Sequence, residues 1–139
     1  MSRPYFLTGA LGCIGAWVVE RLLARGDQPV VFDLGGEPRR IRDLVGDEGL
    51  ARVRFVQGDI TDADALRRAL GDSGATRVVH LAGLQVPFCK ADPAQGARVN
   101  VLGTIHVFQA ASELGCERVA YASSAAVYGP DDAGRDGGA

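Results

Sequence analysis

The amino-acid sequence predicts an α/β fold, a doubly wound parallel sheet of five strands with helices on both faces. Short apolar segments alternate with longer amphipathic segments from residue 4 to residue 122. A glycine-rich turn joins the first apolar segment to the first amphipathic one, and an acidic residue ends the second apolar segment. Regular alternation of this kind is typical of parallel sheets covered by crossover helices.

The first predicted strand, Pro4 to Thr8, runs directly into a turn with three glycines, and Gly26 ends the helix that follows. The apolar positions of this helix recur at i, i+3, i+4 and i+8, which predicts one buried face. The residues on that face are Ile14, Trp17, Val18 and Leu22. The glycines therefore lie in a strand-to-helix turn.

Glycines in such a turn favour an anion-binding site. Glycine has no Cβ, so it takes positive φ readily and lets a phosphate or a helix approach the backbone closely. Free N–H groups and the positive end of the helix dipole then face the anion. We expect the pyrophosphate of a dinucleotide to be held by Gly9, Gly12, Cys13, Ile14 and Gly15. A tight turn without a ligand is the alternative.

Asp33 ends the second predicted strand, Pro29 to Asp33, and lies 18 residues after Gly15. An acid about 20 residues beyond the glycines hydrogen-bonds the adenosine ribose in dinucleotide-binding folds. Its charge would repel a 2′-phosphate, so Asp33 favours NAD over NADP. Alternatively, Asp33 only starts the turn that follows it. Arg39 and Arg40 keep NADP as an alternative cofactor, although they fit the start of a solvated helix better.

The remaining segments complete the alternation. Three further strands are predicted at Val53 to Gln57, Arg77 to Ala82 and Arg118 to Ala122. The helices between them are one opened by a capping box at Thr61 to Asp64 and ended by Gly71, and one from about Pro93 to Leu114 ended by Gly115. Repeated βα units imply right-handed crossovers. The strand order 3-2-1-4-5 places a ligand at the switch point between strands one and four.

Composition indicates one ordinary globular domain, with 139 residues, 47% hydrophobic and 23% charged. A net charge of −2 does not indicate the positively charged surface that binds nucleic acid or an anionic membrane. There is no signal-peptide pattern and no apolar stretch of about 18 residues, so we expect a cytoplasmic protein. Cys13, Cys89 and Cys116 lack metal-ligand spacing, which predicts no metal site and three buried or half-buried free thiols.

Five segments, residues 8–15, 58–62, 80–83, 100–104 and 123–129, carry a resemblance to a known family. Together and in this order they resemble the extended short-chain dehydrogenase/reductases, in particular the NAD-dependent epimerase/dehydratase family. The resemblance implies a Rossmann fold with NAD as its cofactor. It also implies that the parent enzyme acts on nucleotide sugars.

The resemblance gives cofactor roles to residues after the third and fourth strands. Asp59 would accept a hydrogen bond from the adenine amino group and Ile60 would lie along the ring, although a turn or helix-capping Asp is the alternative. The ribose and pyrophosphate would be lined by Leu81, Ala82 and Gly83. We expect His80 and His106 to be core or helix residues without a catalytic role.

The resemblance also implies residues around the reacting groups. Asn100 would support the site through its side-chain amide, although a solvated helix residue is the alternative. Independently of the resemblance, Gly103 is costly inside a helix and so indicates close packing of helix on sheet. By the resemblance, Ser124 would be the catalytic residue that hydrogen-bonds the reacting sugar hydroxyl, with Ser123 beside the nicotinamide; a serine-rich turn without this role is the alternative. A serine hydroxyl suits this place because it both donates and accepts.

The chemistry of the family requires a Tyr-x-x-x-Lys pair, whose Tyr is the general acid and base. Lys90 is the only lysine in the chain, and Val86 stands four residues before it. We therefore expect the NAD-binding domain over residues 1–128 and a flexible tail over 129–139, truncated before the last strands and without a substrate domain. Such a chain would be inactive alone. A non-catalytic dinucleotide-binding module or regulatory subunit is the alternative function.

Truncation at this point would leave the fifth strand as an exposed edge of the sheet. Unpaired strand edges favour association. We therefore expect reduced stability or self-association, as a homodimer, through that edge and the preceding helix.

Overall fold

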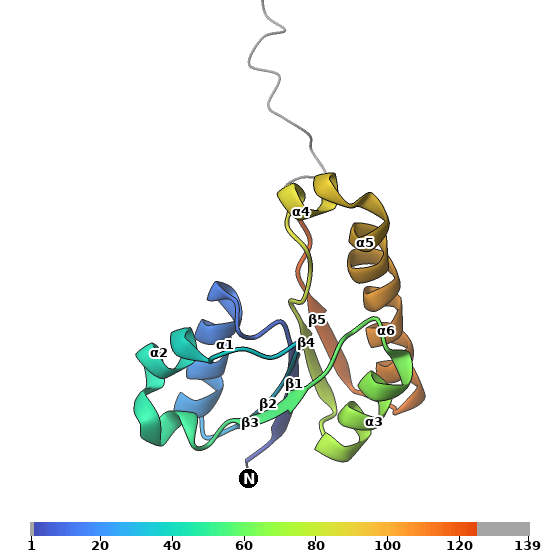
Figure 1. Ribbon diagram of the computed structural model, residues 1–139. Helices are drawn as coiled ribbons and strands as arrows, with labels where there is room; N and C mark the ends of the chain where they lie inside the picture. Colours follow the sequence, from blue (N-terminus) through green and yellow to red (C-terminus); the bar gives the residue numbers. More distant parts are fainter. Residues whose placement is uncertain (1, 125–139) are drawn as a thin grey trace, which may run out of the picture.

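A parallel sheet with the strand order β3-β2-β1-β4-β5 forms the centre of the protein (Figure 1). The computed structural model describes residues 2–124. The strands are β1 (Pro4–Thr8), β2 (Gln28–Asp33), β3 (Arg54–Gln57), β4 (Arg77–His80) and β5 (Arg118–Tyr121). The predicted fold class and strand order are confirmed. The expected tail, residues 129–139, lies outside the described residues.

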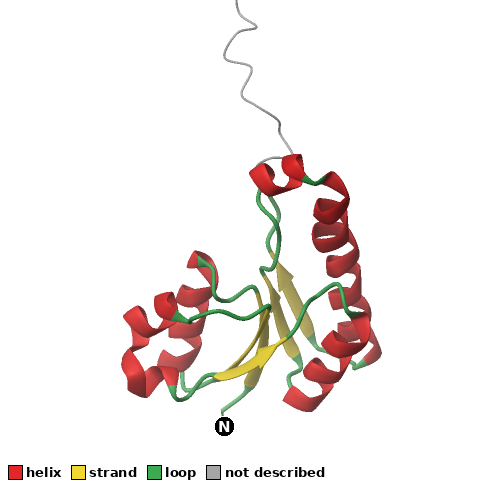
Figure 2. Cartoon of the chain, viewed as in Figure 1, coloured by secondary structure: helices red, strands yellow, loops and turns green. Residues whose placement is uncertain are grey.

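Helices cover both faces of the sheet (Figure 2). On one face α1 (Cys13–Ala24) packs against α2 (Arg39–Leu50), and on the other α3 (Ala63–Ser73) packs against α6 (Thr104–Glu113). Two short helices, α4 (Val86–Ala91) and α5 (Pro93–Ala97), lie near the carboxyl end of β4. No helix within residues 2–124 is long and apolar enough to cross a membrane.

The core has two layers because successive strand residues point to opposite faces. Phe6 and Val30 pack with the α3 and α6 side, whereas their neighbours Leu7 and Val31 pack with the α1 and α2 side. All four are essentially inaccessible to solvent. Burial on both faces explains why the central strands are almost continuously apolar.

The predicted buried face of α1 is partly wrong. Ile14 and Trp17 are 66% and 51% exposed, and the buried residues of α1 are Gly15, Ala16, Val19, Leu22 and Leu23. Small residues face the sheet because α1 begins very close to β1. A Cβ on Gly15 would lie 2.4 Å from the Cα of Ala10. Hydrophobic periodicity did not identify Gly15 and Ala16 as buried, because neither has a large apolar side chain.

The predicted bounds of α3 are also corrected. Its N-cap is Asp62, whose side chain accepts a hydrogen bond from Ala65 N, and not Thr61. The helix passes through Gly71 and ends at Ser73, where Gly74 takes a left-handed conformation with φ 65°. Asp62 is the better cap because its carboxylate also stabilises the positive end of the helix.

The long helix predicted from Pro93 to Leu114 exists but is not uniform. Between α5 and α6 the segment Arg98–Gly103 is a π-helix. The short helix α4 was not predicted. Strand β3 starts one residue later than expected, β4 ends two residues earlier, and β5 ends one residue earlier. The prediction of three buried or half-buried thiols is confirmed for Cys89 and Cys116 but wrong for Cys13, which is exposed because it lies at the open N-terminus of α1.

Candidate functional site

The glycine turn after β1 lies directly against the end of β4. Gly9 has φ 71°, and a Cβ at this position would lie 2.5 Å from Ala82 N and 2.7 Å from the carbonyl carbon of Leu81. No other residue fits there without moving one of the two strands. The turn therefore forms at the boundary between β1 and β4, the switch point of the sheet.

The N-terminus of α1 offers free hydrogen-bond donors. Gly12 is the N-cap residue and no side chain caps the helix. The N–H of Gly12 donates to Gly9 O, but the N–H groups of Cys13, Ile14 and Gly15 have no acceptor in the described part of the chain. Three donors at the positive end of a helix dipole are suited to bind an anion.

Asp33, at the end of β2, is tied to the glycine turn. Its Oδ2 accepts a hydrogen bond from Leu11 N at 3.3 Å, and its Oδ1 accepts one from Leu34 N at 2.9 Å. The turn-forming role of Asp33 is therefore real. Each carboxylate oxygen can accept more than one hydrogen bond, so Asp33 keeps the capacity to accept from a ligand.

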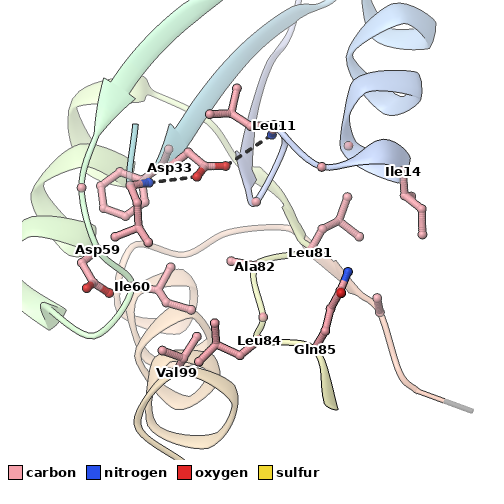
Figure 3. Close-up of a pocket in the computed structure, with 18 of the residues that line it drawn as sticks. Leu11, Ile14, Asp33, Asp59, Ile60, Leu81, Ala82, Leu84, Gln85 and Val99 are labelled. Carbon is pink, nitrogen blue, oxygen red and sulfur yellow. Dashed lines mark hydrogen bonds between the residues drawn. The ribbon is translucent and has the colours of Figure 1, made fainter. Parts of the chain in front are cut away.

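A cavity of about 520 Å³ joins the turn to Asp33 and continues to the ends of β3 and β4 (Figure 3). Figure 3 shows Asp33 and Asp59 on one side of the cavity and Leu81 and Gln85 on the other. Eleven predicted residues line it: Gly9, Gly12, Cys13, Ile14, Gly15, Asp33, Asp59, Ile60, Leu81, Ala82 and Gly83.

Asp59 and Ile60 form the end of the cavity beyond β3. Asp59 Oδ1 accepts a hydrogen bond from Thr61 N at 2.8 Å, so this carboxylate also stabilises a turn. Ile60 is 6% exposed and packs against Gly103, where a Cβ would lie 2.6 Å from Ile60 Cδ1. Gly103 thus allows close packing as predicted, but against the loop after β3 and not against the sheet itself. His106 Nδ1 lies 2.9 Å from Ile60 O and holds this loop from α6.

A second cavity, of about 680 Å³, adjoins the first and shares with it the segment from Leu81 to Gln85. It brings together the other three predicted residues, Asn100, Ser123 and Ser124. Asn100 lies in the π-helix, and its side chain pairs with the backbone of Leu84. Asn100 Oδ1 accepts from Leu84 N at 2.7 Å and Asn100 Nδ2 donates to Leu84 O at 2.9 Å.

His80 is buried beside the second cavity, and both of its ring nitrogens are hydrogen-bonded. Nδ1 lies 2.6 Å from Thr8 Oγ1 and Nε2 lies 2.9 Å from Thr104 Oγ1. Burial lowers the pKa of His80, which favours the neutral ring. His80 is therefore a satisfied interior residue, as its apolar neighbours in the sequence predict.

The profile of the NAD-dependent epimerase/dehydratase family matches residues 5–137. The chain belongs to this family. Among curated members, UDP-glucose 4-epimerase 2 of Arabidopsis thaliana is 31% identical over 93% of this chain and 38% of its own length. D-erythronate dehydrogenase of Cupriavidus necator is 39% identical over 88% of this chain and 39% of its own length.

A solved structure of the same family has a similar fold. The crystal structure of UDP-glucose 4-epimerase from Brucella ovis in complex with NAD superimposes with a TM-score of 0.78 at 29% identity. The match covers 93% of this chain and 38% of that chain. The chain thus spans somewhat over a third of the length of the family members that it matches.

Sequence reasoning missed some cavity residues that family resemblance did not mark. Leu84 lines both cavities, and Gln95 and Val99 line the first, whereas Gln85, which lines both, belongs to the segment Gln85 to Lys90 that the sequence suggested for substrate contact. Gln85 precedes Pro87, and a proline near the start of a helix is a signal that could have predicted α4 and its N-cap. Nothing local in the sequence indicates that Val99 faces a ligand cavity.

Proposed function

We propose that this chain is the dinucleotide-binding portion of an NAD-dependent epimerase/dehydratase that acts on nucleotide sugars. The observation that carries the proposal is the continuity of the first cavity. It connects the free N–H groups at the start of α1 with the carboxylate of Asp33, two features that suit a diphosphate and a ribose. The residues present therefore fit NAD.

In this proposal the pyrophosphate binds at Gly12, Cys13, Ile14 and Gly15, and Asp33 accepts hydrogen bonds from the adenosine ribose. A second negative charge beside Asp33 would be repelled, so NAD is preferred over NADP. Asp59 and Ile60 contact the adenine. Leu81, Ala82 and Gly83 form the opposite wall, which is built of small or apolar side chains and admits a cofactor close to the backbone.

The nicotinamide end is assigned to the second cavity, where NAD would supply hydride transfer when bound. Ser124 then hydrogen-bonds the reacting sugar hydroxyl, and Ser123 lies beside the nicotinamide. Asn100 holds the wall between the cavities. The printed sequence has Lys90 as its only lysine and no Tyr-x-x-x-Lys pair, so we propose that these 139 residues bind cofactor without turning over substrate.

The names of the relatives support the substrate class only broadly. One is a UDP-glucose 4-epimerase and another a D-erythronate dehydrogenase. We favour a nucleotide sugar because several relatives are UDP-glucose 4-epimerases and a related solved structure is a complex with NAD and UDP. The proposal includes a cytoplasmic location, in keeping with three free thiols at Cys13, Cys89 and Cys116.

The proposal also includes self-association as a homodimer. Strand β5 is an outer strand of the sheet, and the adjoining helical face carries exposed apolar side chains. These are Val101 at 59%, Ile105 at 46% and Phe108 at 39% exposure. Light scattering tests this point: a monomer at all concentrations would refute it.

Calorimetric titration of the 139-residue chain with NAD tests the cofactor assignment. We expect saturable binding with one site per chain, and absence of binding refutes the proposal. Adding UDP-glucose to the NAD complex and following formation of its C4 epimer tests the second part, because an epimerase returns the hydride to the sugar and leaves no net NADH. Formation of the epimer would show that the chain is active alone.

A non-catalytic dinucleotide-binding module is the second candidate function, favoured by the lack of a Tyr-x-x-x-Lys pair in the printed sequence. The two candidates differ in what accompanies this chain. A Tyr-x-x-x-Lys pair encoded downstream in the same reading frame, or in a co-purifying protein, supports the enzyme. A stop codon directly after residue 139 and no such partner support the module.

A further inference from the structure

The side chain of Asn100 holds the middle of the wall shared by the two cavities, where Cys89 Sγ makes a longer contact of 3.4 Å with Leu84 O. Leu84 lies between β4 and α4, and its backbone N–H and C=O both pair with the amide of Asn100. No other residue in the described part of the chain hydrogen-bonds the Leu84 N–H. The position of this wall therefore depends on where the backbone of Asn100 places its side chain.

The backbone of Asn100 is held in turn by Thr104. The N–H of Thr104 donates to Val101 O and not to the Asn100 carbonyl. The hydroxyl of Thr104 donates to Asn100 O instead, at 2.8 Å. π-Helical segments of this kind occur frequently at functional sites.

His80 completes this chain of hydrogen bonds. The Thr104 hydroxyl gives its only hydrogen to Asn100 O, so toward His80 it can only accept. Nε2 of His80 therefore carries the ring proton, and Nδ1 accepts from the hydroxyl of Thr8. Thr8 Oγ1 in turn accepts from Ala82 N at 3.4 Å. Every donor in this series has an acceptor only when the ring is neutral.

We propose that His80 and Thr104 are positioning residues, which hold Asn100 and through it the Leu84 wall of the dinucleotide site. The inference rests on the proposed function for its ligand, but its hydrogen-bond pattern is independent of that function. One end of the series lies at Thr8, directly before the glycine turn, and the other at Leu84. It thus fixes the two sides of the first cavity relative to each other.

The conservative pair Thr104→Val and Thr104→Ser tests the proposal. Valine keeps the shape of threonine and removes the hydroxyl, whereas serine keeps the hydroxyl. We expect Thr104→Val to weaken NAD binding about fivefold, the effect of one lost hydrogen bond, and Thr104→Ser to restore it. Thr76→Val is the matched control, since Thr76 is exposed at the other end of β4. It should bind NAD like the wild type.

Nuclear magnetic resonance supplies a readout that does not depend on NAD. The ring nitrogens of His80 should show the Nε2–H form at pH 7. The Leu84 amide should exchange with solvent faster in Thr104→Val than in the wild type, with Thr104→Ser close to the wild type. An Nδ1–H ring, or equal exchange of Leu84 in all three proteins, overturns the proposal.

The two proposals fail differently. If the wild type binds no NAD, the proposed cofactor function is wrong, while His80 protonation and Leu84 exchange still decide the positioning role. If the wild type binds NAD and Thr104→Val binds it equally well, the positioning role is wrong and the cofactor function stands.

Discussion

The carboxylate of Asp33 accepts a hydrogen bond from the backbone N–H of Leu11, 22 residues earlier in the chain. This bond joins the end of β2 to the glycine turn that follows β1. A residue proposed to hold a ribose therefore also fixes the loop proposed to hold the diphosphate. Substitution of Asp33 is therefore expected to weaken the binding of both the ribose and the diphosphate of the cofactor.

Gly9 provides a test of the close approach between the turn and β4. In Gly9→Ala the new Cβ would meet Ala82 N at 2.5 Å in a backbone with φ 71°. We expect loss of NAD binding and destabilisation by about 3 kcal/mol, from a left-handed alanine and an overpacked contact. Chemical denaturation measures the stability.

Gly26→Ala is the matched control for this substitution. Gly26 has φ 78°, and a Cβ there would meet nothing within 4 Å. The free energy of unfolding should fall by only about 1 to 2 kcal/mol, the cost of a left-handed alanine, and NAD binding should be retained. Equal destabilisation by Gly9→Ala and Gly26→Ala would show that the glycine turn is not in close contact with the end of β4.

Gly103 tests the packing of the π-helix on the adenine end of the cavity. Gly103→Ala would place a Cβ 2.6 Å from Ile60 Cδ1 and push this side chain toward the cavity. We expect a destabilisation of about 1 to 3 kcal/mol, measured by denaturant titration, and weaker NAD binding.

The control is Gly71→Ala in α3, where a Cβ would lie 3.8 Å from Leu114 Cδ2, an ordinary contact. Gly71 lies inside a helix, so alanine should stabilise the protein by about 0.5 to 1 kcal/mol. The account would be wrong if Gly103→Ala were stabilising as well.

His80 makes stability depend on pH. Burial lowers its pKa from the ordinary value of 6.5, so the unfolded chain binds a proton at a higher pH than the folded chain does. Between the two pKa values the unfolded state holds more protons, and stability therefore rises with pH. The contribution of His80 is complete above about pH 6.5 and decreases as pH falls below it.

Urea unfolding of the wild type and His80→Gln between pH 5 and pH 8 measures this effect. The variant should have lower stability at pH 7 and a smaller loss on going from pH 6.5 to pH 5. His106→Gln, which leaves His80 in place, is the control. A wild-type profile that is parallel to that of His80→Gln would contradict the assigned neutral ring.

Local chemistry made much of the fold and site predictable. The spacing of Gly9, Gly12 and Gly15 between an apolar strand and a helix predicts a βα turn, and the structure has this turn at the switch point of the sheet. The role of Asp33 was predictable because it ends the next strand in the sequence, 18 residues after Gly15. Glycines and acids at strand ends carry this information within about 30 residues of sequence.

Tertiary contacts determine what the sequence did not predict. Trp17 is exposed because the small residues Gly15 and Ala16 occupy the face against β1, a requirement set by the distance between elements. In the π-helix, Asn100 pairs with Leu84 through its side chain, and its carbonyl accepts a hydrogen bond from the hydroxyl of Thr104. Neither contact has a periodic pattern that could reveal it.

The most direct test is to measure the dissociation constants of NAD and NADP by calorimetry for the wild type and Asp33→Ala. Asp43→Ala, an exposed carboxylate on α2, serves as control. We expect the wild type to prefer NAD, and Asp33→Ala to bind NAD about tenfold more weakly and to lose most of that preference. Equal NAD affinity in the wild type and Asp33→Ala, with the same preference over NADP, would contradict the central claim that Asp33 holds the ribose beside the glycine turn.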